Sequence, residues 1–179
     1  MNISLSSLTA LIFLSVLAIA PACGQDKPGT KPLVAFLVRH AEKMEAGEDP
    51  GLTAAGESRA RILAAMLRTA GITQLHSSDY KRTRNTAAPT AELLGLKARI
   101  YDPRDLPALV AELKAAGGRH LIVGHSNTTP ALAKLLGGQA GAPVDEKGEY
   151  DRLYVITVDA SGEASTVLLR YGAPFLKGK

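Results

Sequence analysis

The sequence has little cysteine, few aromatic side chains and no tryptophan. One cysteine, Cys23, occurs among 179 residues, and aromatic residues make up 4% of the chain. A single cysteine can form neither an intramolecular disulfide nor a cysteine-based zinc site. Surfaces that stack bases or sugars need aromatic platforms, which argues against such a surface here. The net charge of +4 is mild and no long Lys/Arg block occurs, so we expect no nucleic-acid partner.

Charged residues are also missing before Asp26. Residues 5–20 form an apolar run that is shorter than the roughly 20 residues a membrane span needs. Its length and the small residues after it are typical of a signal peptide. We therefore expect residues 1–22 to be a signal peptide and residues 23–32 to be a flexible tether.

The processing of this segment has three interpretations. Residues 20–22 read Ala-Pro-Ala, which fits ordinary secretion, whereas Cys23 at the cleavage point fits the lipidated first residue of a bacterial lipoprotein. The third interpretation is an uncleaved anchor. All three place the domain outside the cytoplasm, in the periplasm or on the outer surface, and we expect a lipid tether at Cys23. The sequence does not indicate the oligomeric state.

Strand and helix patterns alternate through the rest of the chain. Continuous apolar runs at 33–38 and 120–123 predict strands buried on both faces. The other expected elements are strands at 74–77, 98–101, 153–158 and 164–169, and helices at 60–70, 83–94, 106–113 and 130–136. This order predicts an α/β fold, a three-layer α/β/α sandwich with a mainly parallel central sheet, formed by residues 33–179 as one domain.

Chemistry-bearing residues follow the predicted buried strands. In such sheets ligands bind at the carboxyl ends of the strands, and His40 and His125 lie there. Arg39 precedes His40, and Arg82 follows a third strand. Arginine is costly to bury without an anion, and its planar fork suits a phosphoryl group. The sequence therefore predicts a phosphoryl site, whereas His76 and His120 are expected to be structural.

The motifs LVRHAEK, LTAAG, SSDYKRTRNTA and VGHSN, in this order, resemble the histidine phosphatase superfamily, which has the phosphoglycerate mutase-like fold. The resemblance spans residues 33–169. It implies that His40 is a nucleophile that forms a phosphohistidine, and that Arg39, Arg82 and His125 bind the phosphoryl group. It also implies that neither a metal nor a cofactor is needed. We expect Ser126, next to His125, to bind the phosphoryl group as well.

The resemblance also implies a carboxylic acid that protonates the leaving oxygen. Asp105, after the predicted strand 98–101, is the residue we expect in this role, with Asp102 and Glu42 as alternatives. Asp105 is equally well placed as the N-cap of the next helix, and Asp102 could simply start a turn before Pro103.

These residues predict a metal-independent phosphatase that hydrolyses small phosphomonoesters through a phosphohistidine on His40. The stretch between Arg82 and His125 is too short for a large lid, and an open site favours hydrolysis over a mutase reaction. The alternatives are a phosphohistidine-protein phosphatase, a mutase-like phosphotransferase and a non-catalytic module that binds phosphorylated ligands. A serine hydrolase is disfavoured because no histidine follows Ser126, and a metal site is disfavoured because two arginines would adjoin the cation.

Overall fold

A computed structural model describes residues 31–177 of the chain. The predicted signal peptide, residues 23–30 of the predicted tether and residues 178–179 lie outside this range. Within residues 31–177, none of the helices has both the length and the apolar character that crossing a membrane requires.

Strands and helices alternate along the described chain and then give way to a hairpin. The strands are β1 (Leu33–Arg39), β2 (Gln74–Ser78), β3 (Ala98–Tyr101), β4 (Gly118–Gly124), β5 (Arg152–Val158) and β6 (Ala164–Arg170). The helices are α1 (Ala54–Leu67), α2 (Lys81–Leu94), α3 (Leu106–Ala116) and α4 (Thr128–Leu135). The predicted element order is therefore confirmed.

The central sheet is mixed, so the expected mainly parallel sheet is only partly confirmed. Its strand order is β3-β2-β4-β1-β5-β6. The first four of these strands are parallel neighbours, whereas β5 runs antiparallel to both β1 and β6. A short turn joins β5 to β6, which makes that pair antiparallel, and the chain also enters β5 against the direction of β1.

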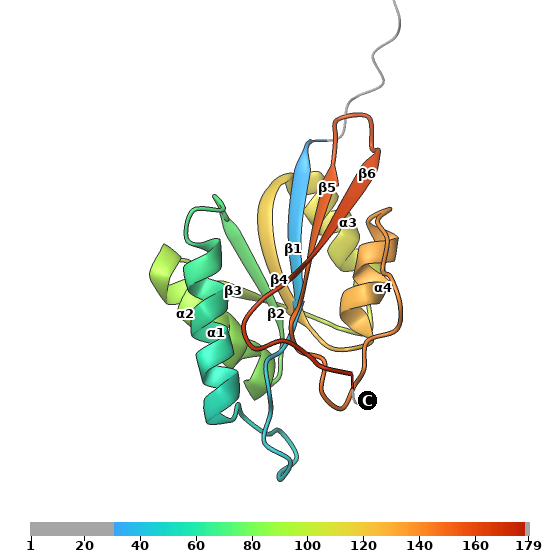
Figure 1. Cartoon of the computed structure of the whole chain (residues 1–179). Coiled ribbons are helices and arrows are strands. Elements are labelled where there is room, and N and C mark those ends of the chain that lie inside the picture. The colour runs from blue at the N-terminus through green and yellow to red at the C-terminus, as the bar shows by residue number, and fades with distance from the viewer. Residues whose placement is uncertain (1–30, 178–179) are drawn as a thin grey trace, which may run out of the picture.

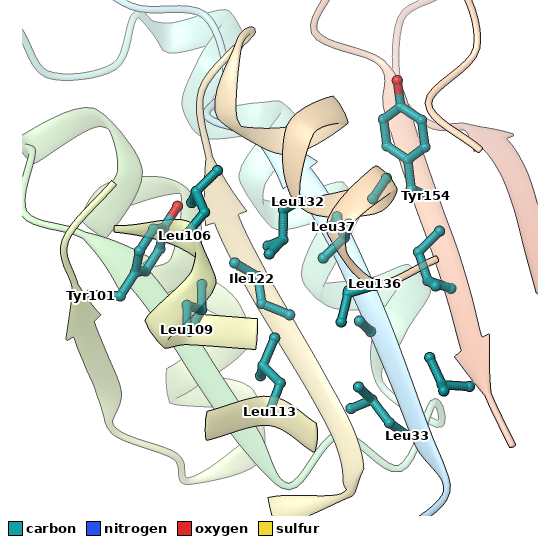
Figure 2. Close-up of a cluster of buried hydrophobic side chains, with 14 residues drawn as sticks. Leu33, Leu37, Tyr101, Leu106, Leu109, Leu113, Ile122, Leu132, Leu136 and Tyr154 are labelled. Atoms are coloured by element: carbon teal, nitrogen blue, oxygen red, sulfur yellow. The ribbon is translucent and has the colours of Figure 1, made fainter. Parts of the chain in front are cut away.

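Helices cover both faces of this sheet, with α1 and α2 on one side and α3 and α4 on the other (Figure 1). Side chains of β1 alternate between the two faces, as strand geometry requires. Leu33 and Leu37 join the core under α3 and α4, which Figure 2 shows with Ile122 of β4 beside them. Phe36 and Val38 join the second core under α1 and α2. The expected three-layer α/β/α arrangement is therefore present.

Helix α1 begins six residues before its predicted start, because a cap rather than apolar spacing sets its first turn. The Thr53 hydroxyl accepts a hydrogen bond from the Gly56 N–H at 3.1 Å. A Cβ on Gly56 would overlap the backbone of Glu42, so glycine allows α1 to lie directly against the segment after β1. Helix α2 continues through Pro89 to Leu94.

Two buried histidines lie on neighbouring strands. His76 of β2 and His120 of β4 are 1% and 0% exposed, and His76 Nε2 lies 3.1 Å from His120 Nδ1. The other ring nitrogen of His120 lies 2.8 Å from the Gly117 carbonyl oxygen, to which it donates. The pair belongs to the interior of the sheet and does not line the site described below.

Candidate active site

A cavity of about 940 Å³ opens at the carboxyl ends of β1, β2 and β4. The fold brings together three segments that are far apart in the chain, since the cavity is lined by all the predicted residues: Arg39, His40, Arg82, His125 and Ser126. The arrangement follows from the parallel register, in which Arg39 is paired with Gly124 and both strands end at the same edge of the sheet.

His40 is buried at the floor of this cavity and is held in one tautomer. Its backbone N–H donates to the Gly124 carbonyl at 2.9 Å, and its Nδ1 lies 2.8 Å from the Ala41 carbonyl oxygen. A carbonyl only accepts hydrogen bonds, so Nδ1 carries the proton and Nε2 keeps its lone pair. Burial lowers the pKa of His40 to about 3, assisted by the nearby positive charges, although the Ala41 carbonyl opposes the shift. His40 is therefore a neutral imidazole with a free nucleophilic nitrogen.

Arg39 is held by the main chain of the segment before β5. Its two terminal nitrogens donate to the carbonyl oxygens of Asp145, Glu146 and Glu149 at 3.2, 2.7 and 3.1 Å. The guanidinium also lies 4.1 Å from the centre of the Tyr150 ring. The Nε atom of Arg39 is buried without a hydrogen-bond partner in the part of the chain that the structure describes.

Arg82, in the first turn of α2, is anchored in a comparable way. Its guanidinium stacks 4.3 Å from the centre of the Tyr80 ring, and one terminal nitrogen lies 3.7 Å from a carboxylate oxygen of Asp49. Within residues 31–177, its Nε atom is likewise buried and unpaired. A buried donor without a partner costs about 1–3 kcal/mol. Both arginines line the cavity, so it carries two positive charges, which suits an anion.

His125 lies beside His40, with 5.5 Å between the ring centres. Its Nε2 is 2.8 Å from the hydroxyl of Ser78, at the end of β2, and the Tyr80 ring contacts it edge-on. Burial lowers the pKa of His125 to about 4, and the positive charges of Arg82 and Arg39 add to that effect. Because the ring is neutral when the cavity holds no anion, any positive charge on it must arrive with the ligand.

The three carboxylates considered as the general acid are all engaged elsewhere. Asp105 Oδ1 accepts from the Ala108 N–H at 3.1 Å and caps α3, and Asp105 does not line the cavity. Asp102 is half-exposed and binds the guanidinium of Arg104. Glu42 lines the cavity, but both of its oxygens accept from Arg59 at 2.8–3.0 Å. The structure thus brings Glu42 to the cavity wall and leaves Asp105 outside it.

Sequence reasoning missed the role of residues 145–149, which hold Arg39. Tyr150, which follows these residues, lies 5.9 Å from His40 between ring centres. The segment acts through its main-chain carbonyls, which no side-chain pattern reveals. Within this segment, Glu149 has a side chain with a structural role of its own. Its carboxylate binds Arg152 and Arg170, and the residue is 3% exposed.

Glu149 stays ionised within that network. Burial alone raises its pKa, but hydrogen bonds from Arg152, the Asp145 N–H and Arg170 outweigh burial and lower the pKa to about 2. This ion-pair network holds both ends of the segment that binds Arg39. Among residues 31–177, no three histidine, cysteine, aspartate or glutamate side chains come close enough to hold a metal ion together.

Comparisons with known proteins agree with this geometry. Residues 35–104 match the histidine phosphatase superfamily (branch 1). The probable phosphoglycerate mutase GpmB of Yersinia enterocolitica is 40% identical over 79 residues, which is 40% of this chain and 36% of that protein. The match therefore spans only about a third of the length of such curated relatives.

Two solved structures share the fold. The protein histidine phosphatase SixA complexed with tungstate has a TM-score of 0.63 and 18% identity, covering 77% of this chain and 97% of that one. The alpha-ribazole phosphatase of Shigella flexneri has a TM-score of 0.62 and 16% identity, covering 82% of this chain and all of that one. Residues 35–104 are thus similar in sequence to the histidine phosphatase superfamily, and the chain shares its fold with solved phosphatase structures.

Proposed function

We propose that the chain is a metal-independent phosphatase that hydrolyses phosphomonoesters through a phosphohistidine on His40. One observation carries the proposal: a neutral His40, whose Nε2 keeps its lone pair, lines the same cavity as Arg39 and Arg82. The imidazole supplies a nucleophile, and the two arginines supply positive charge where a transferring phosphoryl group needs it.

The reaction runs in two displacements. His40 Nε2 attacks phosphorus while the bond from phosphorus to the substrate oxygen breaks, and that oxygen takes up a proton. Water then attacks the phosphohistidine, the P–N bond breaks, and phosphate leaves with His40 restored. Arg39, Arg82 and His125 neutralise the charge on the non-bridging oxygens in both steps. Ser126, on the same wall, would donate to one of these oxygens.

The first displacement requires a group that gives a proton to the leaving oxygen, and each candidate carboxylate is already bound to another part of the chain. Asp105 could supply it only after releasing the N-cap of α3, and Glu42 only after releasing Arg59. This engagement favours a second candidate, hydrolysis of phosphohistidine on a protein. The second ring nitrogen of phosphohistidine would take its proton from solvent, since the free imidazole has a pKa of about 6.5. Departure of that leaving group then needs no carboxylic acid.

One assay series tests both proposals in metal-free buffer that contains a chelator. Wild-type protein should hydrolyse p-nitrophenyl phosphate and leave an acid-labile phosphoenzyme on rapid quenching. The His40→Ala variant should lose both, with turnover reduced by about a thousandfold or more because the covalent step is gone. His76→Gln, which removes a histidine outside the cavity, is the matched control, and circular dichroism checks its fold.

The outcomes separate the alternatives. Full activity in His40→Ala would refute His40 as the nucleophile. Preference for a phosphohistidine peptide over alkyl phosphates of equal charge would favour the second candidate. Transfer of the phosphoryl group to an added alcohol, in place of water, would indicate a phosphotransferase. Tight vanadate binding without turnover of any of these substrates would leave a binding module and overturn the phosphatase.

A further inference from the structure

The hydroxyl of Ser78 connects His125 to the first turn of α2. Ser78 and Thr83 are both fully buried. Ser78 Oγ lies 2.8 Å from His125 Nε2 and 3.1 Å from Thr83 Oγ1. Thr83 Oγ1 in turn lies 2.8 Å from the Ser78 carbonyl oxygen and 2.9 Å from the Tyr80 carbonyl oxygen. These five groups form one chain of donors and acceptors in which the protons can be counted.

The count fixes the direction of each bond. Carbonyl oxygens only accept, so the single proton of the Thr83 hydroxyl points to one of the two carbonyls. Thr83 Oγ1 is then an acceptor toward Ser78, and the single proton of Ser78 goes to it. The Ser78 oxygen therefore accepts from the His125 ring, which requires a proton on Nε2. With the opposite tautomer, either the contact between the two hydroxyls or both contacts from Thr83 to the carbonyls would lack a proton.

We propose that Ser78 is a positioning residue that holds His125 as its Nε2–H tautomer and makes Nδ1 the nitrogen that meets the phosphoryl group. This inference rests on the proposed function, because it assumes that the cavity receives a phosphoryl group. It assigns His40 and His125 opposite tautomers. His40 is protonated on Nδ1 and attacks with Nε2, whereas His125 is protonated on Nε2 and faces the ligand with Nδ1.

Opposite tautomers give the two rings different tasks. A neutral His125 presents a lone pair on Nδ1, which would repel a phosphoryl dianion, so binding must bring one proton. That proton lies between Nδ1 and a phosphoryl oxygen, and it turns the ring into a donor. The groups that face His125 are Arg39 and His40 from the β1 end, Tyr80 from the β2–α2 loop and Arg82 from α2. None of these is a carboxylate that could stabilise the proton before the anion arrives.

Imidazole nitrogen resonances of the ¹⁵N-histidine-labelled protein test the tautomer directly at pH 8. The chain has four histidines, and a His125→Asn variant identifies the signals of His125. Wild-type protein should show His125 protonated on Nε2. Thr83→Val should move the proton to Nδ1, because the freed Ser78 proton can then point to Nε2. Ser78→Ala should leave a mixture of the two tautomers, and Thr83→Ser should restore the wild-type state.

Ser77→Ala is the matched control, since Ser77 is an equally buried neighbour whose hydroxyl donates to the Ser78 carbonyl and, within residues 31–177, does not bind the His125 ring. It should leave the His125 tautomer unchanged. Vanadate inhibition should weaken by about tenfold in Ser78→Ala and Thr83→Val and stay unchanged in the control. An Nδ1–H tautomer in wild-type protein, or a tautomer unaffected by Ser78→Ala and Thr83→Val, would overturn the proposal. The resonance measurement needs no turnover, so its failure is distinguishable from failure of the proposed function.

Discussion

In both Arg39 and Arg82, contacts with the protein fix the orientation of the guanidinium group. Arg39 gives its terminal nitrogens to three carbonyl oxygens, and Arg82 stacks on Tyr80 and approaches Asp49. Arg39 uses three of its five N–H groups on these carbonyls, and the Arg82 contact with Asp49 is 3.7 Å long, so within residues 31–177 both residues keep N–H groups for a ligand. A donor held rigidly before the ligand arrives binds it with little further loss of side-chain entropy. The geometry is therefore that of a preorganised anion site.

Asp105 allows a test at the scale of one carboxylate. Because its oxygen caps α3, Asp105→Ala should lower the free energy of unfolding by about 1 kcal/mol, whereas Asp105→Asn should keep the cap and the stability. Both variants should retain turnover of p-nitrophenyl phosphate within a few-fold. Urea denaturation and steady-state kinetics measure the two effects. A hundredfold loss of turnover in Asp105→Asn at unchanged stability would instead identify Asp105 as the general acid.

The site residues at strand ends could be predicted from the sequence, whereas the groups that hydrogen-bond them could not. Arg39, His40 and His125 directly follow apolar runs that only a buried strand explains, so their common edge follows from parallel pairing. The carbonyls that hold Arg39 come from a segment more than a hundred residues away and carry no side-chain signature. The general acid stayed ambiguous because a carboxylate before a helix serves equally well as a cap and as an acid.

At the scale of elements, the start of α1 is coupled to the segment after β1. Thr53 both caps α1 and donates its backbone N–H to the Glu42 carbonyl at 2.9 Å. Arg59, one turn further along α1, binds the Glu42 side chain and also the carbonyls of Tyr171 and Ala173. Helix α1 therefore fixes the position of Glu42, which forms part of the cavity wall next to His40.

Gly56 gives this coupling a sharp test. Gly56→Ala would place a Cβ on the Glu42 backbone, which cannot move aside as a flexible side chain would. We expect it to lower the free energy of unfolding by about 1–3 kcal/mol and to weaken vanadate binding, because the wall beside His40 shifts. Gly51→Ala is the control, since its Cβ would meet only ordinary contacts. Equal stability and affinity in the two variants would contradict the coupling.

The order of strands and helices along the chain was predictable for a physical reason, whereas the direction of β5 relative to β1 was not. Apolar runs and helical spacing reveal strands and helices locally, which is why β1, β4 and α3 matched expectation. The direction of β5 depends on where the chain re-enters the sheet after α4, and the intervening segment has no periodic pattern. Apolar spacing alone does not mark the start of α1, which instead shows in Thr53 and Gly56 as the pattern of a helix cap and turn.

At the scale of the whole molecule, buried histidines make stability depend on pH. Burial, with a contribution from His120, lowers the pKa of His76 to about 4, and burial also lowers the pKa of His120. His40 and His125 are shifted in the same direction, to about 3 and about 4. In the unfolded chain these groups have a pKa of about 6.5, so below that pH the unfolded state binds more protons than the folded state.

We therefore expect full stability above about pH 6.5 and a progressive loss as the pH falls toward 4. Each such histidine contributes a slope of up to about 1.4 kcal/mol per pH unit within that window. Glu149 contributes only at lower pH, since its pKa of about 2 lies below its ordinary value. Urea unfolding at pH 8, 6.5 and 5 measures the trend, and His76→Gln should reduce the slope. A free energy of unfolding that stays constant from pH 8 to 5 would contradict this account.

The hydrogen bonds that fix Arg39 have a consequence for which sequence changes this protein can tolerate in evolution. Its acceptors at positions 145, 146 and 149 are main-chain oxygens, so every amino acid at those positions brings the same acceptor. Replacing the side chain of Glu146 leaves the bond in place, whereas inserting or deleting one residue nearby moves all three oxygens at once. Drift can therefore replace the side chain of Glu146, whereas Glu149 is constrained by its ion pairs and the whole segment is constrained in length.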